Sequence, residues 1–147
     1  MLDYKVQAQR GIMNYRFLEH TADARVECTG ATFAELLEAA ALALYAVAFR
    51  RMEDRSEDRR LISIAAEKPE DVLVRWLQEL IYLMEAEHFA VTRFRFMHAD
   101  ANRVEAEVQG YRYRAEDRED EVKAATYHGM KVEQQETGWR AEVIFDL

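Results

Sequence analysis

The chain has 147 residues, of which 50% are hydrophobic and 33% are charged, and its formal net charge at pH 7 is -8. This length and balance predict one globular domain with a buried core. The negative charge disfavours direct, stable binding of nucleic acid and favours divalent cations and basic protein surfaces. The single cysteine excludes a disulfide within this sequence, and no apolar run approaches the roughly 20 residues that span a bilayer. We therefore expect a cytoplasmic protein that does not bind membranes.

Residues 1–12 carry no periodic pattern and precede a second methionine, Met13. We interpret them as a disordered N-terminal extension, with a tag remnant or an alternative start site as the other interpretations. The predicted folded domain accordingly covers residues 13–147.

Two short strands are predicted at the start of this domain. Residues 15–18 form the first, and residues 22–28 alternate apolar and polar side chains, which is typical of a half-buried strand. The joint between them, residues 20–23, has the sequence HTAD and places Asp23 on the polar face where the second strand begins. Because so few residues separate the two strands, we expect them to be neighbours in a sheet.

Two helices are predicted in the middle of the chain. Thr32 precedes Glu35 at the spacing of a capping box, and apolar residues at helical spacing follow to about residue 50. A second helix with a wide apolar stripe covers residues 69–88, after a short strand at residues 61–65. The large side chains of this second helix are interpreted as core: Trp76, Tyr82 and Met84.

The last third of the chain is predicted to be strands. Residues 91–97 and 104–108 form a hairpin, residues 122–134 are mostly extended, and residues 139–147 form the final strand. Strands at both ends with two helices between them indicate the α+β class. We predict a two-layer sandwich, with a mostly antiparallel sheet and both helices packed on one face.

The two ends of the domain carry the candidate metal ligands. Asp23 begins one strand and Asp146 ends another, each on the polar face. If these strands are antiparallel neighbours, the two carboxylates lie side by side, and the terminal carboxylate of Leu147 adds a third anionic group. Such a cluster requires a cation, and its hard oxygen donors favour Ca²⁺ or Mg²⁺. The pattern alone is also typical of two solvated surface aspartates, which are common.

Other polar residues allow more than one interpretation, and the single cysteine allows one. His20 is interpreted as holding the turn through hydrogen bonds to the backbone, with metal ligation or acid–base chemistry as the alternatives. Lys123, Tyr127 and His128 form either a small polar site or a cross-strand set that packs on a sheet. Cys28 alternates with apolar residues and is expected to be an inert core residue.

Two charged segments, residues 51–60 and 116–121, are interpreted as solvated loops, with docking of a basic partner surface as the alternative. The sequence contains no Gly-rich phosphate loop, no C-x-x-C and no G-x-S-x-G. We therefore predict no catalytic residues.

Five blocks of this sequence, in order and at matching spacing, resemble the archease family over residues 13–147. The blocks are residues 17–23 (FLEHTAD), 30–35 (GATFAE), 76–82 (WLQELIY), 122–130 (VKAATYHGM) and 143–147 (VIFDL). Each block alone is weak, whereas the ordered set is specific.

The resemblance implies a function in RNA processing. Archease is not itself an enzyme but an activator of the GTP-dependent RNA-splicing ligase. It promotes guanylylation of the ligase active-site histidine and allows multiple turnover. That ligase joins RNA 2′,3′-cyclic-phosphate or 3′-phosphate ends to 5′-hydroxyl ends, as in tRNA splicing. An alternative role for the family is as a chaperone-like modulator of a tRNA cytosine-5 methyltransferase.

The resemblance also implies site residues. The family binds a divalent cation, for which Ca²⁺ is the first expectation and Mg²⁺ or Mn²⁺ are the alternatives. Its ligands correspond to Asp23, Asp146 and Leu147 of this sequence. The matching blocks further suggest a functional surface, which comprises His20, Lys123, Thr126, Tyr127 and His128. Residues 1–12 lie outside the family pattern.

Overall fold

The computed structural model describes residues 13–20 and 23–147, and the predicted extension, residues 1–12, lies outside the described residues. The elements in chain order are β1 (Asn14–His20), β2 (Asp23–Gly30), α1 (Phe33–Ala48), β3 (Asp58–Ala65), α2 (Pro69–Glu87), β4 (Phe89–Ala99), β5 (Arg103–Arg112), the short 3₁₀ helix η1 (Ala115–Asp117), β6 (Ala124–Gln135) and β7 (Gly138–Asp146). In the part of the chain that the structure describes, no helix is long and apolar enough to cross a membrane.

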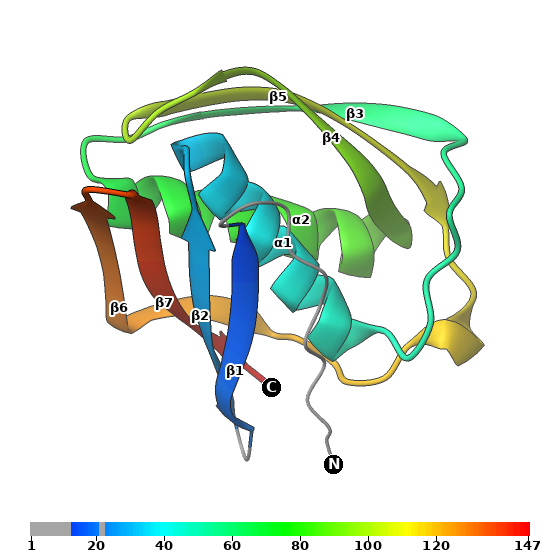
Figure 1. The fold of residues 1–147 in the computed structure, drawn as a ribbon. Coiled ribbons are helices and arrows are strands. Elements are labelled where there is room, and N and C mark those ends of the chain that lie inside the picture. The colour runs from blue at the N-terminus through cyan, green and yellow to red at the C-terminus, as the bar shows by residue number, and fades with distance from the viewer. Residues whose placement is uncertain (1–12, 21–22) are drawn as a thin grey trace.

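The strands form two antiparallel sheets with the helices between them (Figure 1). The larger sheet has the order β1-β2-β7-β6 and the smaller one the order β3-β5-β4. Both helices contact strands of both sheets. The α+β class, the antiparallel pairing and the two helices are confirmed. The arrangement differs from a two-layer sandwich because a second sheet covers the other side of the helices.

The composition of α1 explains this middle position. Eleven of its 16 residues are buried, and they occur all around the helix rather than along one stripe. A helix that is apolar on every side is stable only when it is enclosed. Its many alanines allow the close approach of neighbouring elements. The predicted capping box is present, because Thr32 Oγ1 accepts a hydrogen bond from Glu35 N at 3.1 Å and Glu35 Oε1 accepts one from Ala31 N at 2.9 Å.

The two helices meet at Trp76. Its side chain is fully buried, and its indole Nε1 donates a hydrogen bond to the Leu37 carbonyl of α1 at 2.9 Å. Met84 is buried as predicted. The prediction for Tyr82 was wrong, because 56% of this residue is exposed. Tyr82 lies on the exposed stripe of α2.

The prediction of a loop over residues 51–60 was wrong in its last part. The strand β3 already begins at Asp58, which pairs with Gly110 of β5. Because β3 is an edge strand with one face toward solvent, it tolerates charged residues that resemble a loop in the sequence.

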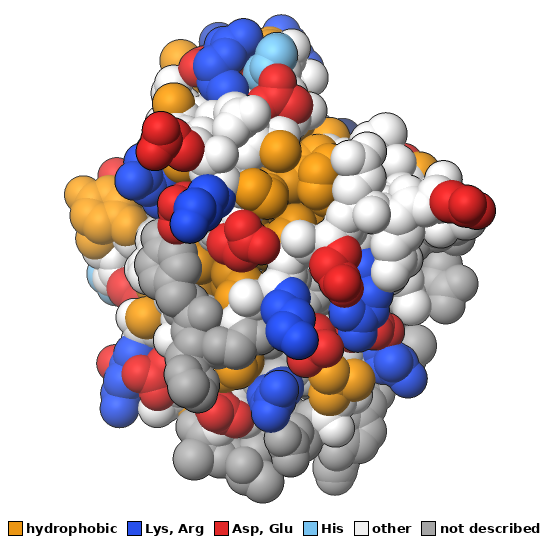
Figure 2. Space-filling model, turned by 90° about the vertical axis from the view of Figure 1, so that its left-hand side faces the viewer, with side chains coloured by type: hydrophobic (Ala, Val, Ile, Leu, Met, Phe, Trp, Pro, Cys, Tyr) orange, Lys and Arg blue, Asp and Glu red, His pale blue; other side chains and the backbone are white. Residues whose placement is uncertain are grey.

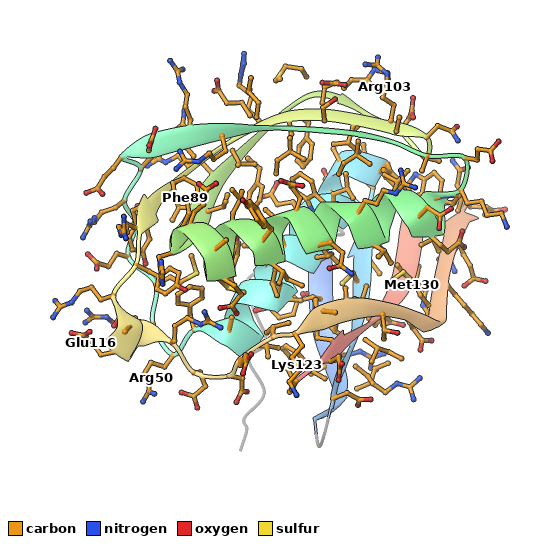
Figure 3. All side chains as sticks on the ribbon, turned by 180° about the vertical axis from the view of Figure 1, so that it is seen from behind. Arg50, Phe89, Arg103, Glu116, Lys123 and Met130 are labelled. Atoms are coloured by element: carbon orange, nitrogen blue, oxygen red, sulfur yellow. The ribbon has the colours of Figure 1, made fainter. Side chains whose placement is uncertain are left out.

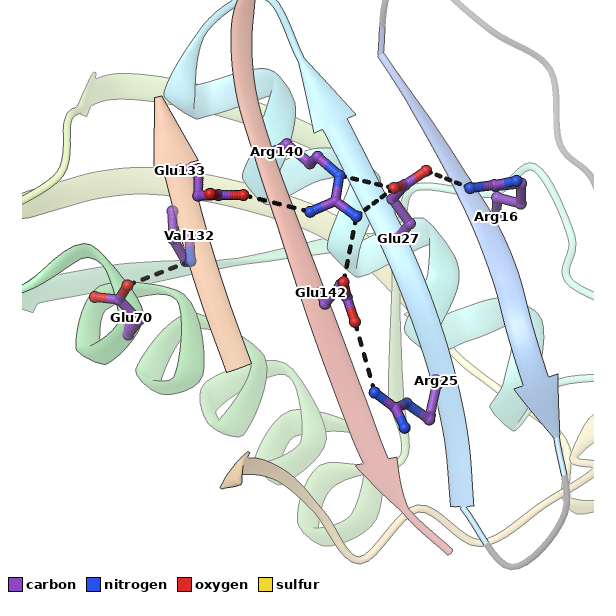
Figure 4. Close-up of polar contacts among 8 residues, drawn as sticks. All are labelled: Arg16, Arg25, Glu27, Glu70, Val132, Glu133, Arg140 and Glu142. Carbon is purple, nitrogen blue, oxygen red and sulfur yellow. Dashed lines mark hydrogen bonds and ion pairs between the residues drawn. The ribbon is translucent and has the colours of Figure 1, made fainter. Parts of the chain in front are cut away.

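Charged side chains of both signs are interspersed on the side of the molecule where β6 lies (Figure 2). On the outer face of the larger sheet they form a connected network (Figure 4). Its centre is Arg140, whose guanidinium lies 2.6 Å from Glu27, 3.3 Å from Glu142 and 3.5 Å from Glu133. At its edges, Arg16 pairs with Glu27 at 2.8 Å and Arg25 pairs with Glu142 at 3.6 Å. The network joins β1, β2, β7 and β6 and therefore supports the register of the whole sheet.

These contacts change the ionisation of the groups involved. Burial opposes ionisation of Glu27, but the hydrogen bonds and charges of Arg140 and Arg16 outweigh it and hold the pKa of Glu27 below its ordinary value. The hydrogen bond to Glu27 also raises the pKa of Arg140. A carboxyl whose pKa is lowered in the folded state stabilises the fold above its unfolded pKa. This contribution is lost as the pH falls through the folded pKa.

We expect Glu27→Gln to lower the free energy of unfolding by about 1 kcal/mol at pH 7, because a neutral amide pairs weakly with Arg140. Below about pH 4 the difference from wild type should shrink, because protonation removes the same charge from the wild-type protein. Urea unfolding at pH 7 and at about pH 3.5 measures both effects.

The control for this substitution is Glu133→Gln. Glu133 pairs with the same arginine, but at 3.5 Å and with 54% of its side chain exposed. Its replacement should change stability by less than about 0.5 kcal/mol. Equal losses from the two substitutions would show that Glu27 has no special place in the network.

Candidate metal centre at the end of the larger sheet

Asp23 and Asp146 lie directly opposite each other in the structure. The strands β2 and β7 are antiparallel neighbours, and their register pairs Asp23 with Asp146, Ala24 with Phe145 and so on to the far end. Side chains of directly opposed residues project from the same face, with Cβ atoms roughly 4.5–5.5 Å apart. Asp23 is half-buried and Asp146 is exposed. Leu147, the last residue of the sequence, follows directly.

A second pair of opposed carboxylates in the same two strands provides a comparison. Glu27 lies directly opposite Glu142, four residues from the aspartate pair. Like charges in this position are destabilising. Arg140 contacts both glutamates, so their charges are balanced.

The aspartate pair has no such balance. Among the described residues, no ion pair or side-chain hydrogen bond reaches the carboxylate of Asp23 or of Asp146. Two adjacent unbalanced carboxylates attract a cation. The sheet therefore neutralises the Glu27–Glu142 pair, whereas it leaves the Asp23–Asp146 pair without a cationic partner among the described residues.

The donor set at this end consists of oxygen atoms. Within the described ranges, no three side chains of His, Cys, Asp and Glu come together. A cation at Asp23 and Asp146 would therefore take its remaining ligands from the Leu147 carboxylate, from backbone carbonyls or from water. This mixture of hard oxygen ligands fits Ca²⁺, Mg²⁺ or Mn²⁺ rather than zinc.

Other predicted residues lie at the same end of the sheet. The backbone N–H of Lys123 donates a hydrogen bond to the carbonyl of Asp146 at 2.8 Å, and the Lys123 side chain is exposed. His20, the last residue of β1, pairs with Ala24. The antiparallel register thus places the end of β1, the start of β2, the end of β7 and the start of β6 together.

Thr126, Tyr127 and His128 lie further along β6. Thr126 pairs with Ile144, and beyond it the register between β6 and β7 shifts until Lys131 pairs with Glu142. Tyr127 and His128 lie in this irregular segment. The side chains of Tyr127, His128 and His20 lie outside the described residues. The interpretations of these three residues therefore remain predictions.

The predicted core cysteine is confirmed. Cys28 is fully buried in β2, and burial raises the pKa of its thiol. A thiol that stays protonated is a poor nucleophile and a poor metal ligand.

Sequence reasoning did not find the network around Arg140. The alternation of charges along β2 and β7 was the available signal, but which charges meet depends on the register. The β2–β7 register that pairs Asp23 with Asp146 also brings Arg140 beside Glu27.

Comparison with known proteins agrees with this structure. Residues 15–147 match the Archease protein family (MTH1598/TM1083). Protein archease of Archaeoglobus fulgidus is 36% identical over 138 residues, which cover 92% of this chain and 100% of that protein. Protein archease of Methanosarcina acetivorans is 33% identical over 139 residues, which cover 90% of this chain and 95% of that protein.

Two solved structures share the fold. The solution structure of protein 1598 of Methanobacterium thermoautotrophicum has a TM-score of 0.75 and 28% identity, and the match covers 90% of this chain and 98% of that one. The crystal structure of "an archease, possible chaperone" from Thermotoga maritima has a TM-score of 0.65 and 25% identity, and the match covers 96% of this chain and 98% of that one. The chain described here belongs to the archease family.

Proposed function

We propose that this protein is a cation-binding accessory protein that activates the GTP-dependent RNA-splicing ligase. In this role it promotes guanylylation of the ligase and its multiple turnover in tRNA splicing and RNA repair. The observation that carries the proposal is the direct pairing of Asp23 with Asp146, without a balancing cationic group among the described residues. The chain belongs to the archease family, and the role expected for that family supports the choice of the ligase as the proposed partner.

The ligands of the proposed cation are Asp23, Asp146 and the terminal carboxylate of Leu147. A bound Ca²⁺, or Mg²⁺ or Mn²⁺ in its place, would offer a Lewis-acidic centre with open positions for oxygen atoms of the partner or of GTP phosphates. The residues of this chain do no covalent chemistry in the proposal. Asp23 and Asp146 hold the cation at an exposed end of the sheet, where another protein can reach it.

The residues around the cation would form the contact surface. Lys123 is exposed beside Asp146, and a lysine ammonium there pairs well with phosphate or with acidic partner groups. His20, Thr126, Tyr127 and His128 are the other members of the proposed surface. The strands that carry Asp23 and Asp146 are paired along eight residues, which favours precise placement of the cation against a partner active site.

A second candidate function is a chaperone-like modulator of a tRNA cytosine-5 methyltransferase. The description of the Thermotoga maritima structure as a possible chaperone favours it. This candidate predicts protection of the methyltransferase from aggregation without any need for the cation.

We expect Ca²⁺ to raise the melting temperature of the wild-type protein, because a ligand that binds only the folded state stabilises it. Asp23→Asn and Asp146→Asn should abolish this response. In EDTA the same substitutions should stabilise the protein by about 0.2–1 kcal/mol, because they remove repulsion between directly opposed charges. Differential scanning calorimetry with a Ca²⁺ titration measures both the loss of the Ca²⁺ response and the stabilisation in EDTA.

Glu133→Gln is the matched control, since it removes a carboxylate from the same sheet at the other end. It should keep the full response to Ca²⁺. A peptide tail added after Leu147 should weaken binding if the terminal carboxylate is a ligand. An unchanged Ca²⁺ response in Asp146→Asn would refute the proposed metal centre.

We expect wild-type protein to increase guanylylation of the ligase and to permit many ligation cycles per enzyme. Asp23→Ala and Asp146→Ala should lose most of this stimulation, because they lack the cation. The measurements are incorporation of labelled GMP into the ligase and ligated RNA formed per ligase molecule. Stimulation by both variants at the wild-type level would show that the cation plays no part. Suppression of methyltransferase aggregation without any effect on the ligase would favour the second candidate.

A further inference from the structure

Arg118 joins three parts of the molecule through one largely buried guanidinium. Its side chain is 16% exposed, and it lies directly after η1, in the segment that connects β5 to β6. Its Nε donates a hydrogen bond to the carbonyl of Ala48, the last residue of α1, at 2.9 Å. Nη1 and Nη2 donate to the two carboxylate oxygens of Glu85 in α2 at 3.1 and 2.9 Å. A bidentate pair of this kind holds the arginine in one orientation.

Two further hydrogen bonds connect the guanidinium to its own segment. Nη2 donates to the carbonyl of Asp120 at 3.0 Å. Nη1 donates to the hydroxyl of Tyr113 at 3.0 Å, and that hydroxyl donates to the carbonyl of Met84 in α2 at 2.7 Å. The five N–H groups of Arg118 are thus all in use. The segment around Arg118 is therefore bound to both helices.

The segment that Arg118 holds leads directly into the candidate metal centre. From Glu116 in η1 the chain passes below α2 to Lys123, just before β6 (Figure 3). The N–H of Lys123 donates to the carbonyl of Asp146 at 2.8 Å. Two residues separate Lys123 from Asp120, whose carbonyl Arg118 holds. The arginine and the metal centre are therefore connected by a short stretch of backbone.

The two sides of Asp146 are supported unequally. On the β2 side, eight consecutive residue pairs fix the register. On the β6 side, residues 124–126 pair with β7, and the register then shifts. Three pairs supply few hydrogen bonds, so the start of β6 depends on contacts outside the sheet. Gln78 of α2 provides one of them, to the Ala125 carbonyl at 3.3 Å, and Arg118 holds the chain just before it.

We propose that Arg118 is a positioning residue for the candidate metal centre. It fixes the segment before β6, and this segment fixes the backbone of Asp146 from the side opposite to β2. The inference rests on the proposed function, in which Asp146 and Leu147 hold the cation. Arg118 acts through the backbone rather than through its charge, which Glu85 balances. Groups that orient metal ligands typically contribute roughly 10–100-fold to metal affinity.

The first test measures Ca²⁺ binding to the full-length protein by isothermal titration calorimetry. Arg118→Gln should raise the Kd for Ca²⁺ by about tenfold. Arg118→Lys keeps the charge but lacks the planar set of donors, so it should weaken binding nearly as much. Glu85→Gln removes the bidentate partner and should raise Kd by about threefold. Since the side chain of Glu85 is 37% exposed, this variant decides the question if Arg118→Gln does not fold.

The matched control is Arg60→Gln. Arg60 also bonds to a glutamate of α2, Glu87, at 2.8 Å, and its guanidinium lies 4.5 Å from the ring centre of Phe89. It supports the smaller sheet, away from the aspartate pair. Its replacement should lower stability in urea unfolding and leave the Kd for Ca²⁺ unchanged.

A second measurement does not require the cation. In EDTA, Arg118→Gln should speed hydrogen exchange of the Lys123 amide by roughly fivefold, because its bond to the Asp146 carbonyl opens more often. Arg60→Gln should leave this exchange rate unchanged. Exchange detected by NMR resolves the single amide.

The outcomes distinguish the inference from the function on which it rests. Absence of Ca²⁺ binding by wild-type protein would overturn the proposed metal centre and the inference with it. Binding by wild type, together with an unchanged Kd in Arg118→Gln and Glu85→Gln, would overturn the inference alone. An equal rise of Kd in Arg60→Gln would also overturn it, because affinity would then follow general stability. Unchanged exchange of the Lys123 amide in Arg118→Gln would contradict the route through the backbone.

Discussion

The pairing of β2 with β7 is the constraint on which the rest of the structure depends. These strands come from opposite ends of the folded domain, and eight consecutive residue pairs join them, from Asp23 with Asp146 to Gly30 with Trp139. Their inner faces place Val26 and Val143 against the helices. Their outer faces carry the cross-strand charge contacts around Arg140. A slip by one residue would exchange the two faces, so burial of the inner face also fixes the position of the outer charges.

The same register produces two carboxylate pairs with opposite consequences. Glu27 and Glu142 are held by Arg140 and contribute to the stability of the sheet. Among the residues that the structure describes, no arginine contacts Asp23 or Asp146, and repulsion between directly opposed carboxylates costs stability in the absence of a cation. A protein that needed only a stable sheet would gain from an amide at either aspartate. Two unbalanced carboxylates at the accessible end are what the proposed cation site requires.

The local sequence pattern was sufficient to predict part of the fold and of the candidate site. Alternation along β2 and β7 predicted which residues face the core, and it predicted that Asp23 and Asp146 share a face. The capping box at Thr32 located the start of α1. Other features depend on how elements pack. The sequence of no single strand indicates that a second sheet is present. Tyr82 is an aromatic residue of the kind found in cores, although α2 turns its side chain outward. The hydrogen bond of Gln78 to the Ala125 carbonyl of β6 is another contact that no periodicity predicts.

The net charge of -8 is unevenly distributed over the structure. On the outer face of the larger sheet, arginines balance most of the glutamates, so that face presents little net field. At the end of that sheet, Asp23 and Asp146 lie opposite each other, and among the described residues no arginine contacts either carboxylate. The unbalanced negative charge is therefore local to this end of the sheet. A cation or a partner protein that binds there would meet both carboxylates. An accessory protein without catalytic groups can act in this way, because its effect depends on where it binds and what it places there.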